Sequence, residues 1–318
     1  MTYPSVTIGV TTYNAEDSIR DALQSVFGQT APIAQVLVID DCSTDSTMSV
    51  LEEYAGRPGF EVYQNETNSG VAVSRNEIVQ RAKGDFIVFF DDDDISDPKR
   101  VEAQVERIVE YECEFADGAP VICHTARLQI YPDGGQRLEP TMGQTRGRLA
   151  PFGLPVARRA LMGEPLKDGY GSCATCSQAG RTEVYREIDG FDARLRRCGD
   201  FEFAIRMALA GGHFVGISEP LVTQKMTSTA EKSLDKLKEF ILLVLEKHQP
   251  IFDDGNSYKF CRAWIALKFD WMAGRRSKFT FGIARLSLRH PILTLKRVCM
   301  ALPNLAHNRV LNRFFRDI

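Results

Sequence analysis

The sequence contains no long hydrophobic run. Its longest uninterrupted apolar stretch is Phe240–Leu245, whereas a helix needs about 20 apolar residues to cross a bilayer. The N-terminus also lacks the pattern of a secretory signal peptide, because Thr2-Tyr-Pro-Ser leads directly into a β-branched segment. We therefore expect neither a membrane-spanning helix nor a secretion signal.

The cysteines form no regular framework. The chain has eight of them, and only Cys173 and Cys176 make a C-x-x-C pair. No second pair and no pair of histidines completes a zinc site. We expect reduced, partly buried thiols, which are typical of a protein in the cytoplasm.

Charge is distributed unevenly along the chain. The composition is that of an ordinary globular protein, with 44% hydrophobic and 25% charged residues and a net charge of −3. Residues 259–318, however, carry 13 Lys and Arg residues against two Asp and Glu. An acidic body with a basic tail predicts that the tail meets an anionic surface.

The first part of the chain alternates between strand and helix patterns. Apolar or β-branched strands are expected at Val6–Thr11, Gln35–Asp41, Phe60–Tyr63 and Phe86–Phe90, with helices at Asp17–Phe27, from Ser43 to Tyr54, and at Asn68–Ala82. Continuously apolar strands that alternate with helices predict an α/β fold with a parallel sheet covered on both faces. Ligands of such sheets bind at the carboxyl ends of the strands.

The later elements are less regular. We expect a helix at Asp97–Glu112 with Asp97 as N-cap, a strand at Val121–Tyr131, irregular functional loops at Leu138–Asp168, a return to the sheet at Ser172–Tyr185 and a helix at Asp200–Ala210. After Lys225, amphipathic helices are expected at Lys232–His248, Tyr258–Arg275, Phe279–Arg289, Ile292–Leu302 and Leu305–Phe315. The predicted domains are residues 1–225 and a basic helical region, 226–318.

Four consecutive aspartates, Asp91–Asp94, follow the apolar strand Phe86–Phe90. Adjacent carboxylates repel one another unless a cation lies among them, and hard divalent ions prefer carboxylate oxygens. The alternative is an acidic turn that caps the next helix, but Asp97-Pro98 already supplies that cap. The run therefore predicts a site for Mn²⁺ or Mg²⁺. Asp94 is the member that we expect to serve the fold alone.

Several motifs, in this order, resemble one enzyme family. They are Thr11-Thr-Tyr-Asn14, Val38-Ile-Asp-Asp-Cys-Ser-Thr-Asp45, Asn68–Asn76, Gly84–Asp94 and Gly190-Phe-Asp192. Together they resemble a family 2 glycosyltransferase of GT-A fold over about residues 5–225. The resemblance implies a Rossmann-like, mostly parallel sheet with helices on both faces and, beyond it, a C-terminal α-helical extension. It also implies inverting transfer of a sugar from a nucleotide-diphosphate donor, expected to be a UDP-sugar.

The resemblance assigns donor-site roles to the acid run. It implies a D-x-D motif at Asp91-x-Asp93, with Asp93 as the direct metal ligand and Asp91 as the second acid of the metal site. Asp91 or Asp92 would face the ribose and sugar of the donor. Four consecutive aspartates leave the register of the motif open by one residue.

Other donor-site residues are implied outside the run. Asp41 would accept a hydrogen bond from uracil, although Asp40 or Asp41 could instead cap the following helix. Thr11, Tyr13 and Asn14 would surround the nucleotide, with a core aromatic as the alternative for Tyr13. Arg75 would pair with donor phosphate or with Asp41, or form an ordinary surface salt bridge.

The resemblance also implies a general base for the acceptor hydroxyl. The family has a Glu-Asp pair after Gly-Phe-Asp; here Gly199 stands in place of the glutamate, and Asp200 is the predicted base. Glu202 is the reserve candidate, and Arg206 would organise the site. The Gly199 departure keeps open a non-catalytic, nucleotide-sugar-binding protein. A nucleotidyltransferase is a further alternative, although the Gly-rich basic loop that such enzymes carry after the first strand is missing.

The basic tail predicts the partners of the chain. Ile292, Leu295, Cys299 and Leu302 share one helical face, and Phe279, Ile283 and Leu286 share another. Basic amphipathic helices bind anionic membrane surfaces, so we expect peripheral contact with the cytoplasmic face of a membrane and a glycan or lipid-linked acceptor. Packing on the catalytic domain or in a homo-oligomer is the alternative. Nucleic-acid binding is not expected.

Overall fold

The computed structural model describes residues 3–227, 233–302, 310–311 and 314. It forms two compact units. The first contains Met1–Gln129, Leu138–Val156 and Leu166–Lys225, and the second contains Ile130–Arg137, Ala157–Pro165 and Met226–Ile318. Two short segments before residue 225 thus belong to the second unit, whereas the predicted division placed them in the first domain.

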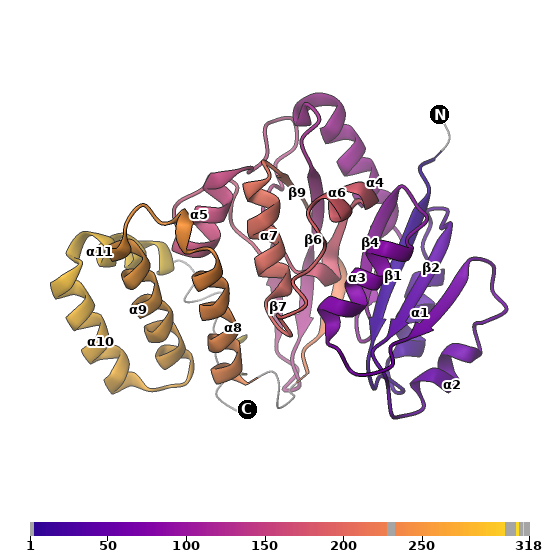
Figure 1. The fold of residues 1–318 in the computed structure, drawn as a ribbon, viewed down its shortest axis with the longest axis horizontal. Helices are drawn as coiled ribbons and strands as arrows, with labels where there is room; N and C mark the ends of the chain where they lie inside the picture. Colours follow the sequence, from indigo (N-terminus) through magenta and orange to yellow (C-terminus); the bar gives the residue numbers. More distant parts are fainter. Residues whose placement is uncertain (1–2, 228–232, 303–309, 312–313, 315–318) are drawn as a thin grey trace. The chain divides into compact units, whose positions relative to one another are not determined.

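One half of the sheet is parallel. Its strands, in spatial order, are β3 (Phe60–Gln64), β2 (Gln35–Asp40), β1 (Val6–Thr12) and β4 (Phe86–Asp91) (Figure 1). Every residue of β1 and β2 is buried, as expected for parallel strands that are covered on both faces. The connecting helices are α1 (Ile19–Phe27), α2 (Thr47–Glu52) and α3 (Val71–Arg81).

The two faces of β1 pack against different helices. Ile8 and Val10 lie in one hydrophobic cluster with Ile19 and Leu23 of α1. Gly9 faces the opposite side of the sheet, where a Cβ added to it would lie 2.4 Å from Cγ2 of Ile78 in α3. The absence of a side chain at this position therefore lets α3 approach the sheet. The predicted α/β class, with a Rossmann-like, mostly parallel sheet between helices, is confirmed.

Beyond β4 the sheet also contains antiparallel pairs, which the strand–helix alternation did not predict. Next to β4 come β8 (Gln178–Arg181), β6 (Val121–Ile130), β9 (His213–Lys225) and β5 (Ile95–Ser96), and β7 (Gln136–Glu139) pairs with β6. The β4–β8, β6–β8 and β5–β9 pairs are antiparallel. Strand β9 was missed because Gly211-Gly212 ended the helical pattern and no clear alternation followed.

Other local predictions need correction. Helix α4 spans Arg100–Tyr111 with Lys99 as N-cap, so Asp97 does not cap it. The Asp97 carboxylate accepts the N–H of Lys99 at 2.9 Å and closes the preceding turn. Within the predicted irregular segment, Leu154–Met162 forms α5. The predicted strand Ser172–Tyr185 divides into η2 (Thr175–Ser177), β8 and α6 (Thr182–Glu187).

Helices dominate the second unit. They are α8 (Leu234–Lys247), η4 (Gln249–Ile251), α9 (Gly255–Met272), α10 (Arg276–Arg289) and α11 (Pro291–Ala301). Asp254 caps α9 by accepting the N–H of Ser257 at 2.6 Å. Four of the five helices predicted after Lys225 are therefore present. The fifth, Leu305–Phe315, falls almost entirely outside the described residues.

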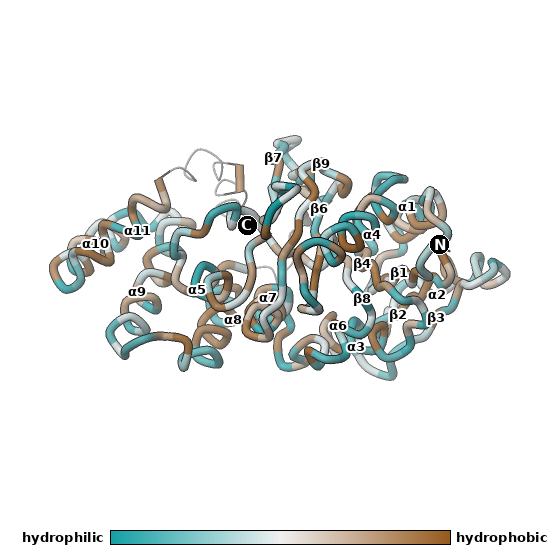
Figure 2. Tube along the Cα trace, turned by 90° about the horizontal axis from the view of Figure 1, so that it is seen from above, coloured by the Kyte–Doolittle hydropathy of each residue, from teal (hydrophilic) through white to brown (hydrophobic). Residues whose placement is uncertain are grey.

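Hydrophobic and polar residues alternate along these helices (Figure 2). Within the described part of the chain, no helix is long and apolar enough to cross a membrane.

Candidate active site

The ends of three parallel strands lie side by side in the first unit. In the register of the sheet, Thr12 of β1 is opposite Asp40 of β2, and Thr11 is opposite Asp91 of β4. The loops that follow these strands therefore begin at one edge of the sheet, which is where ligands of such folds bind. The convergence that the sequence predicted is present.

The loop after β1 joins the other two loops through its main chain. The N–H of Tyr13 donates to Oδ2 of Asp92 at 3.0 Å, and the N–H of Asn14 donates to Oγ of Ser43 at 2.8 Å. Oδ1 of Asn14 accepts the N–H of Thr44 at 2.8 Å. Asn14 has a φ of 49°, a left-handed conformation that asparagine tolerates.

Two side chains of this region, Thr11 and Tyr13, differ in accessibility. Thr11 is buried within β1, whereas Tyr13 is 46% exposed. The exposure of Tyr13 rules out its alternative assignment as a core aromatic. The Tyr13 ring is accessible to a ligand at the strand ends, whereas Thr11 is part of the buried strand that precedes the loop.

Asp40 and Asp41 are adjacent but accept hydrogen bonds from different parts of the chain. Asp40 accepts the N–H and the hydroxyl of Ser43 and the side-chain amide of Gln64, and so holds the turn after β2. Asp41 accepts the main-chain N–H of Ser69 at 2.9 Å, that of Gly70 at 2.7 Å and Nδ2 of Asn65 at 2.8 Å.

Three donors do not exhaust the carboxylate of Asp41. An ionised carboxylate has about four lone-pair sites, which leaves one for a ligand N–H. The same three hydrogen bonds hold the segment that leads into α3, because Gly70 is the N-cap of that helix. Asp41 thus organises the loop and retains capacity to accept from a nucleotide base.

Arg75 of α3 pairs with the acid run. Its Nη2 lies 3.3 Å from Oδ1 of Asp91, and both side chains are largely buried. The guanidinium also lies 5.6 Å from the ring centroid of Phe191. Arg75 thus pairs with Asp91 and not with Asp41 or an exposed carboxylate, and it compensates part of the charge of Asp91. Its pairing with donor phosphate stays a prediction.

The four aspartates have different environments. Strand β4 ends at Asp91, and Asp92 and Asp93, both half-buried, form the turn that follows. Burial, together with the charges of Asp93 and Asp91, raises the pKa of Asp92 from 3.8 to about 7. Because the strand does not continue, strand alternation does not decide which acids share a side.

Asp94 is buried, and neither of its carboxylate oxygens accepts a hydrogen bond from the described residues. Burial and the charges of Asp91 and Asp93 raise its pKa well above the ordinary value, and the charge of Arg127 and the nearby Cys176 thiol oppose that rise. A buried carboxylate without donors is costly unless a cation or a proton compensates it. This environment differs from our expectation that Asp94 serves the fold alone.

Asp94 belongs to a group that fits a divalent cation. Asp91, Asp94 and Cys176 each offer one ligand atom, and these atoms lie within 4.8 Å of one another. Two carboxylates suit Mn²⁺ or Mg²⁺, and a thiol adds a softer donor. The predicted pair was Asp91 and Asp93. The structure gathers Asp91 with Asp94, and it places Asp93 in the turn between them.

Sequence reasoning missed the residues around Cys176. Arg127 of β6 is buried; its Nη1 lies 3.5 Å from Sγ of Cys176 and donates to Oε1 of Gln224 at 2.6 Å, while its Nη2 donates to Oγ of Ser172 at 2.6 Å. Burial raises the pKa of the Cys176 thiol, and Arg127 opposes that rise. The sequence carried one usable signal, an arginine within the predicted strand Val121–Tyr131.

The two candidates for the general base are clearly distinguished. Asp200, near the start of α7 (Gly199–Leu209), is half-buried, and its Oδ1 accepts the N–H of Phe201 at 2.8 Å. Glu202 is fully buried, and both of its oxygens accept from Nε of Arg206 at 2.9 Å. Glu202 is therefore engaged in a structural ion pair, whereas Asp200 is accessible.

Asp200 lies close to the segment that carries Cys176. Its charge, after burial, contributes to raising the pKa of the Cys173 thiol to about 12. A thiol with such a pKa is not a nucleophile at neutral pH. All eight cysteines are free, in agreement with the predicted reduced state.

The Gly190-Phe-Asp192 turn is held from two helices. The side-chain amide of Asn76 in α3 donates to the carbonyl of Phe191 at 2.8 Å and accepts the N–H of the same residue at 2.7 Å. Arg206 donates to the carbonyl of Gly190 at 2.6 Å. The predicted organising role of Arg206 thus has a physical basis, since the same residue binds Glu202 and this turn.

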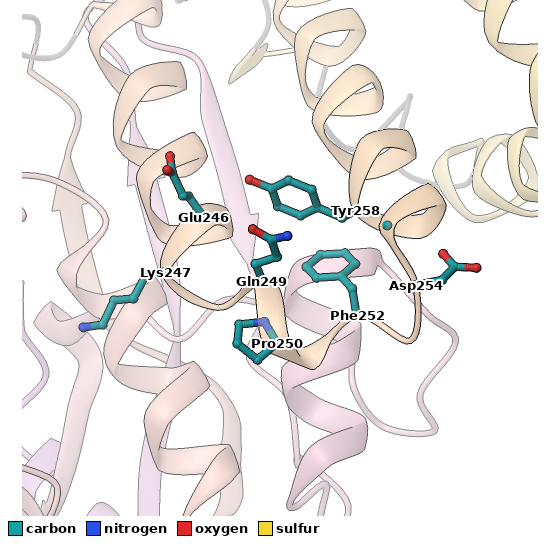
Figure 3. A pocket seen from close by; sticks show the side chains of 8 residues that line it. Glu246, Lys247, Gln249, Pro250, Phe252, Asp254 and Tyr258 are labelled. Atoms are coloured by element: carbon teal, nitrogen blue, oxygen red, sulfur yellow. The ribbon is translucent and has the colours of Figure 1, made fainter.

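The second unit contains a cavity of about 500 Å³. It is lined by Glu246, Lys247, Gln249, Pro250, Phe252, Asp254, Gly255 and Tyr258 (Figure 3). The rings of Phe252 and Tyr258 meet edge to face at 5.4 Å. None of the predicted site residues lines this cavity.

Comparisons with known proteins find several similar glycosyltransferases. A model of the family described as "Glycosyl transferase family 2" matches residues 7–168. The glycosyltransferase EpsE of Bacillus subtilis is 34% identical, with 72% of this chain and 76% of EpsE covered. An uncharacterized glycosyltransferase of Haemophilus influenzae is 27% identical, with 95% and 98% covered. TuaG of B. subtilis, which is named for teichuronic acid biosynthesis, is 38% identical over 41% of this chain and 56% of TuaG.

Solved structures show the same fold. The structure of Staphylococcus aureus TarS residues 1–349 in complex with UDP-GlcNAc has a TM-score of 0.57 and 18% identity, and the match covers 98% of this chain and 89% of that one. The corresponding complex with UDP has a TM-score of 0.56 and 19% identity, with the same shares covered. On the matched family model and the similarity to EpsE, the chain belongs to glycosyl transferase family 2, as its motifs predicted.

Proposed function

We propose that the chain transfers a sugar from a UDP-sugar to a hydroxyl of a cell-surface polysaccharide or of a lipid-linked precursor. Family membership supports the reaction class. The UDP and UDP-GlcNAc complexes of TarS support the choice of donor. TarS is a poly(ribitol-phosphate) β-N-acetylglucosaminyltransferase, and TuaG is named for teichuronic acid biosynthesis; both names support a polymeric cell-surface acceptor.

One observation carries the proposal: the ends of β1, β2 and β4 bring Asp41 and the acid run to the same edge of the sheet. Asp41 would accept the N–H of uracil at the lone-pair site that its three donors leave free. Tyr13, whose ring is exposed, would cover the base, and Asn14 holds the loop in place.

Asp91 and Asp94, with Asp93 from the turn between them, would hold a divalent cation. When bound, Mn²⁺ or Mg²⁺ would neutralise the charge that develops on the leaving diphosphate. The unsatisfied carboxylate of Asp94 supports this assignment, because a cation would supply the partner that the protein does not. Arg75 would keep the Asp91 carboxylate oriented.

Asp200 would act as the general base. Its carboxylate would take the proton of the acceptor hydroxyl while the hydroxyl oxygen forms a bond to the anomeric carbon. The bond from that carbon to the diphosphate oxygen breaks, and UDP leaves with the electron pair. Attack opposite the leaving group inverts the configuration. Glu202 would support α7 without touching the acceptor, because Arg206 engages it.

Calorimetry with UDP, with and without Mn²⁺, tests the donor site. We expect binding that needs the metal and that Asp93→Ala or Asp94→Ala weakens about tenfold or more. Hydrolysis of a panel of nucleotide sugars would then identify the sugar. Absence of metal-dependent UDP binding would contradict both the donor site and the metal.

Asp200→Asn separates an enzyme from a nucleotide-sugar-binding protein that has lost catalysis. Loss of a positioned base lowers turnover by about 10²- to 10⁴-fold, while UDP binding should stay as in the wild type. Equal turnover of Asp200→Asn and wild type would reject Asp200 as the general base. Absence of turnover in the wild type would instead favour the non-catalytic, nucleotide-sugar-binding protein that Gly199 keeps open.

A further inference from the structure

Helices α10 and α11 of the second unit carry an apolar surface that no described residue covers. Phe281, Leu288, Ile292, Leu295 and Leu302 are between 56% and 86% exposed. Phe281 and Leu288 are seven residues apart on α10, and Ile292 and Leu295 are three apart on α11. Each helix therefore presents an apolar stripe at helical spacing, and together we call these five residues the exposed stripes.

Packing within the unit does not explain these stripes, because the two helices use other residues for it. Leu286 of α10 is buried, and a Cβ added at Gly282 would lie 2.2 Å from Cδ2 of Leu267 in α9. On α11 the buried residue is Thr294. Of the two faces predicted from the sequence, the one with Leu286 is thus the packing face, and the one with Ile292 and Leu295 is free.

The surroundings of the stripes are strongly cationic. Residues 271–302 contain seven Lys and Arg residues and no Asp or Glu. Three of the seven are engaged: Arg275 pairs with Asp270, Arg276 lies over Trp271, and Arg297 lies near Trp264. The remaining four make no ion pair with the described part of the chain; they are Lys278, Arg285, Arg289 and Lys296.

We propose that α10 and α11 form a docking surface for an anionic phospholipid bilayer. The exposed stripes would enter the interface, and the four cations would lie at the level of the headgroups. Charge complementarity favours this occupant over a second copy of the chain, because two such faces would bring like charges together. The helices would lie on the bilayer, since none is long and apolar enough to span it within the described residues.

The test is sedimentation of the full chain with vesicles, and it needs neither donor nor turnover. We expect the chain to sediment with phosphatidylcholine vesicles that contain phosphatidylglycerol, and not with phosphatidylcholine alone. High salt should weaken binding, because it screens the cations. Leu288→Glu and Leu295→Glu should each lower binding to anionic vesicles by about tenfold. Arg285→Gln with Lys296→Gln should lower it while leaving the apolar stripes unchanged.

Leu243→Glu is the matched control, because Leu243 of α8 is 45% exposed and receives the same charge outside the two helices. It should bind as the wild type does, and circular dichroism should show that every variant remains folded. Absence of binding to anionic vesicles would overturn the proposal, as would an equal loss in Leu243→Glu. A wild type that self-associates, and that Leu288→Glu converts to monomer without changing vesicle binding, would assign the surface to contacts between copies.

Discussion

Arg75 and Asp91 form an ion pair between α3 and the end of β4, with 3.3 Å between Nη2 and Oδ1. The pair joins the segment that Asp41 organises to the first of four adjacent aspartates. Asp91 also lies with Asp94 and Cys176 in the candidate metal cluster. The charge on Asp91 is therefore shared between a permanent cation of the protein and any divalent ion that binds.

Removal of this cation should destabilise the protein mainly when metal is absent. Arg75→Gln leaves Asp91 largely buried beside other carboxylates, and we expect a loss of about 2 kcal/mol in the free energy of unfolding in EDTA. Mn²⁺ should restore more stability to the variant than to the wild type. Urea unfolding with and without Mn²⁺ measures both effects. The exposed pair of Arg20 and Glu53 supplies the control, since Arg20→Gln should cost less than about 1 kcal/mol.

The aspartates should also make stability depend on pH. The folded-state pKa of Asp92 is raised from 3.8 to about 7, and that of Asp94 is raised in the same direction. The folded state then holds protons that the unfolded state has lost, so the free energy of unfolding should fall as pH rises from about 4 to about 7. Asp94→Asn should flatten this decline and raise the melting temperature at neutral pH in EDTA by about 2–5 °C.

Thermal unfolding across that pH range, in EDTA and in Mn²⁺, measures the effect. Mn²⁺ should stabilise the wild type and have little effect on Asp94→Asn. Asp17→Asn, which alters an exposed carboxylate, should behave like the wild type. A decline with pH that Asp94→Asn leaves unchanged would show that Asp94 is not its source.

The two adjacent acids after β2, Asp40 and Asp41, should differ in their effect on UDP binding. Asp41→Asn places an amide N–H₂ against the N–H of either Ser69 or Gly70, because these two donate to different carboxylate oxygens, and it weakens the acceptor proposed for uracil. We expect UDP binding to weaken by at least about tenfold and stability to fall by about 1–3 kcal/mol. Asp40→Asn should cost similar stability through Ser43 and Gln64 and affect UDP binding less. Equal losses of UDP affinity would indicate that both act only through the fold.

The two acids of α7 should be distinguishable in the same way. Glu202→Gln breaks a buried pair with Arg206 and loosens the turn at Gly190, so it should cost about 3 kcal/mol of stability. Asp200→Asn should leave the melting temperature nearly unchanged while it lowers turnover by about 10²- to 10⁴-fold. The pH–rate profile of Glu202→Gln, measured below its melting temperature, should keep the shape of the wild-type profile, because the proposed base is intact. A shifted acidic limb would point instead to Glu202 as the titrating base.

Local pattern was enough for the parallel half of the fold. The strands β1, β2 and β4 are rich in apolar and β-branched residues, so both their existence and their parallel pairing follow from burial on two faces. The strands beyond β4 were harder to predict, because β8 is only four residues long and β9 has no clean alternation. Helix α5 lies among Gly, Pro and Arg residues, where packing overrides weak local preference.

The sequence by itself determined which residues stand at the strand ends: Thr11 to Asn14, Asp40 with Asp41, and Asp91 to Asp94. It also determined the family and the basic helices after residue 225. Only the tertiary structure decided what each acid does. Asp40 and Asp41 are adjacent but accept hydrogen bonds from different donors. Asp94 is buried near Cys176, and its oxygens accept no hydrogen bond from the described residues. Glu202 is paired with Arg206, whereas Asp200 is not. The reason is physical, since the charge state and the free lone pairs of a carboxylate depend on donors that distant segments bring to it.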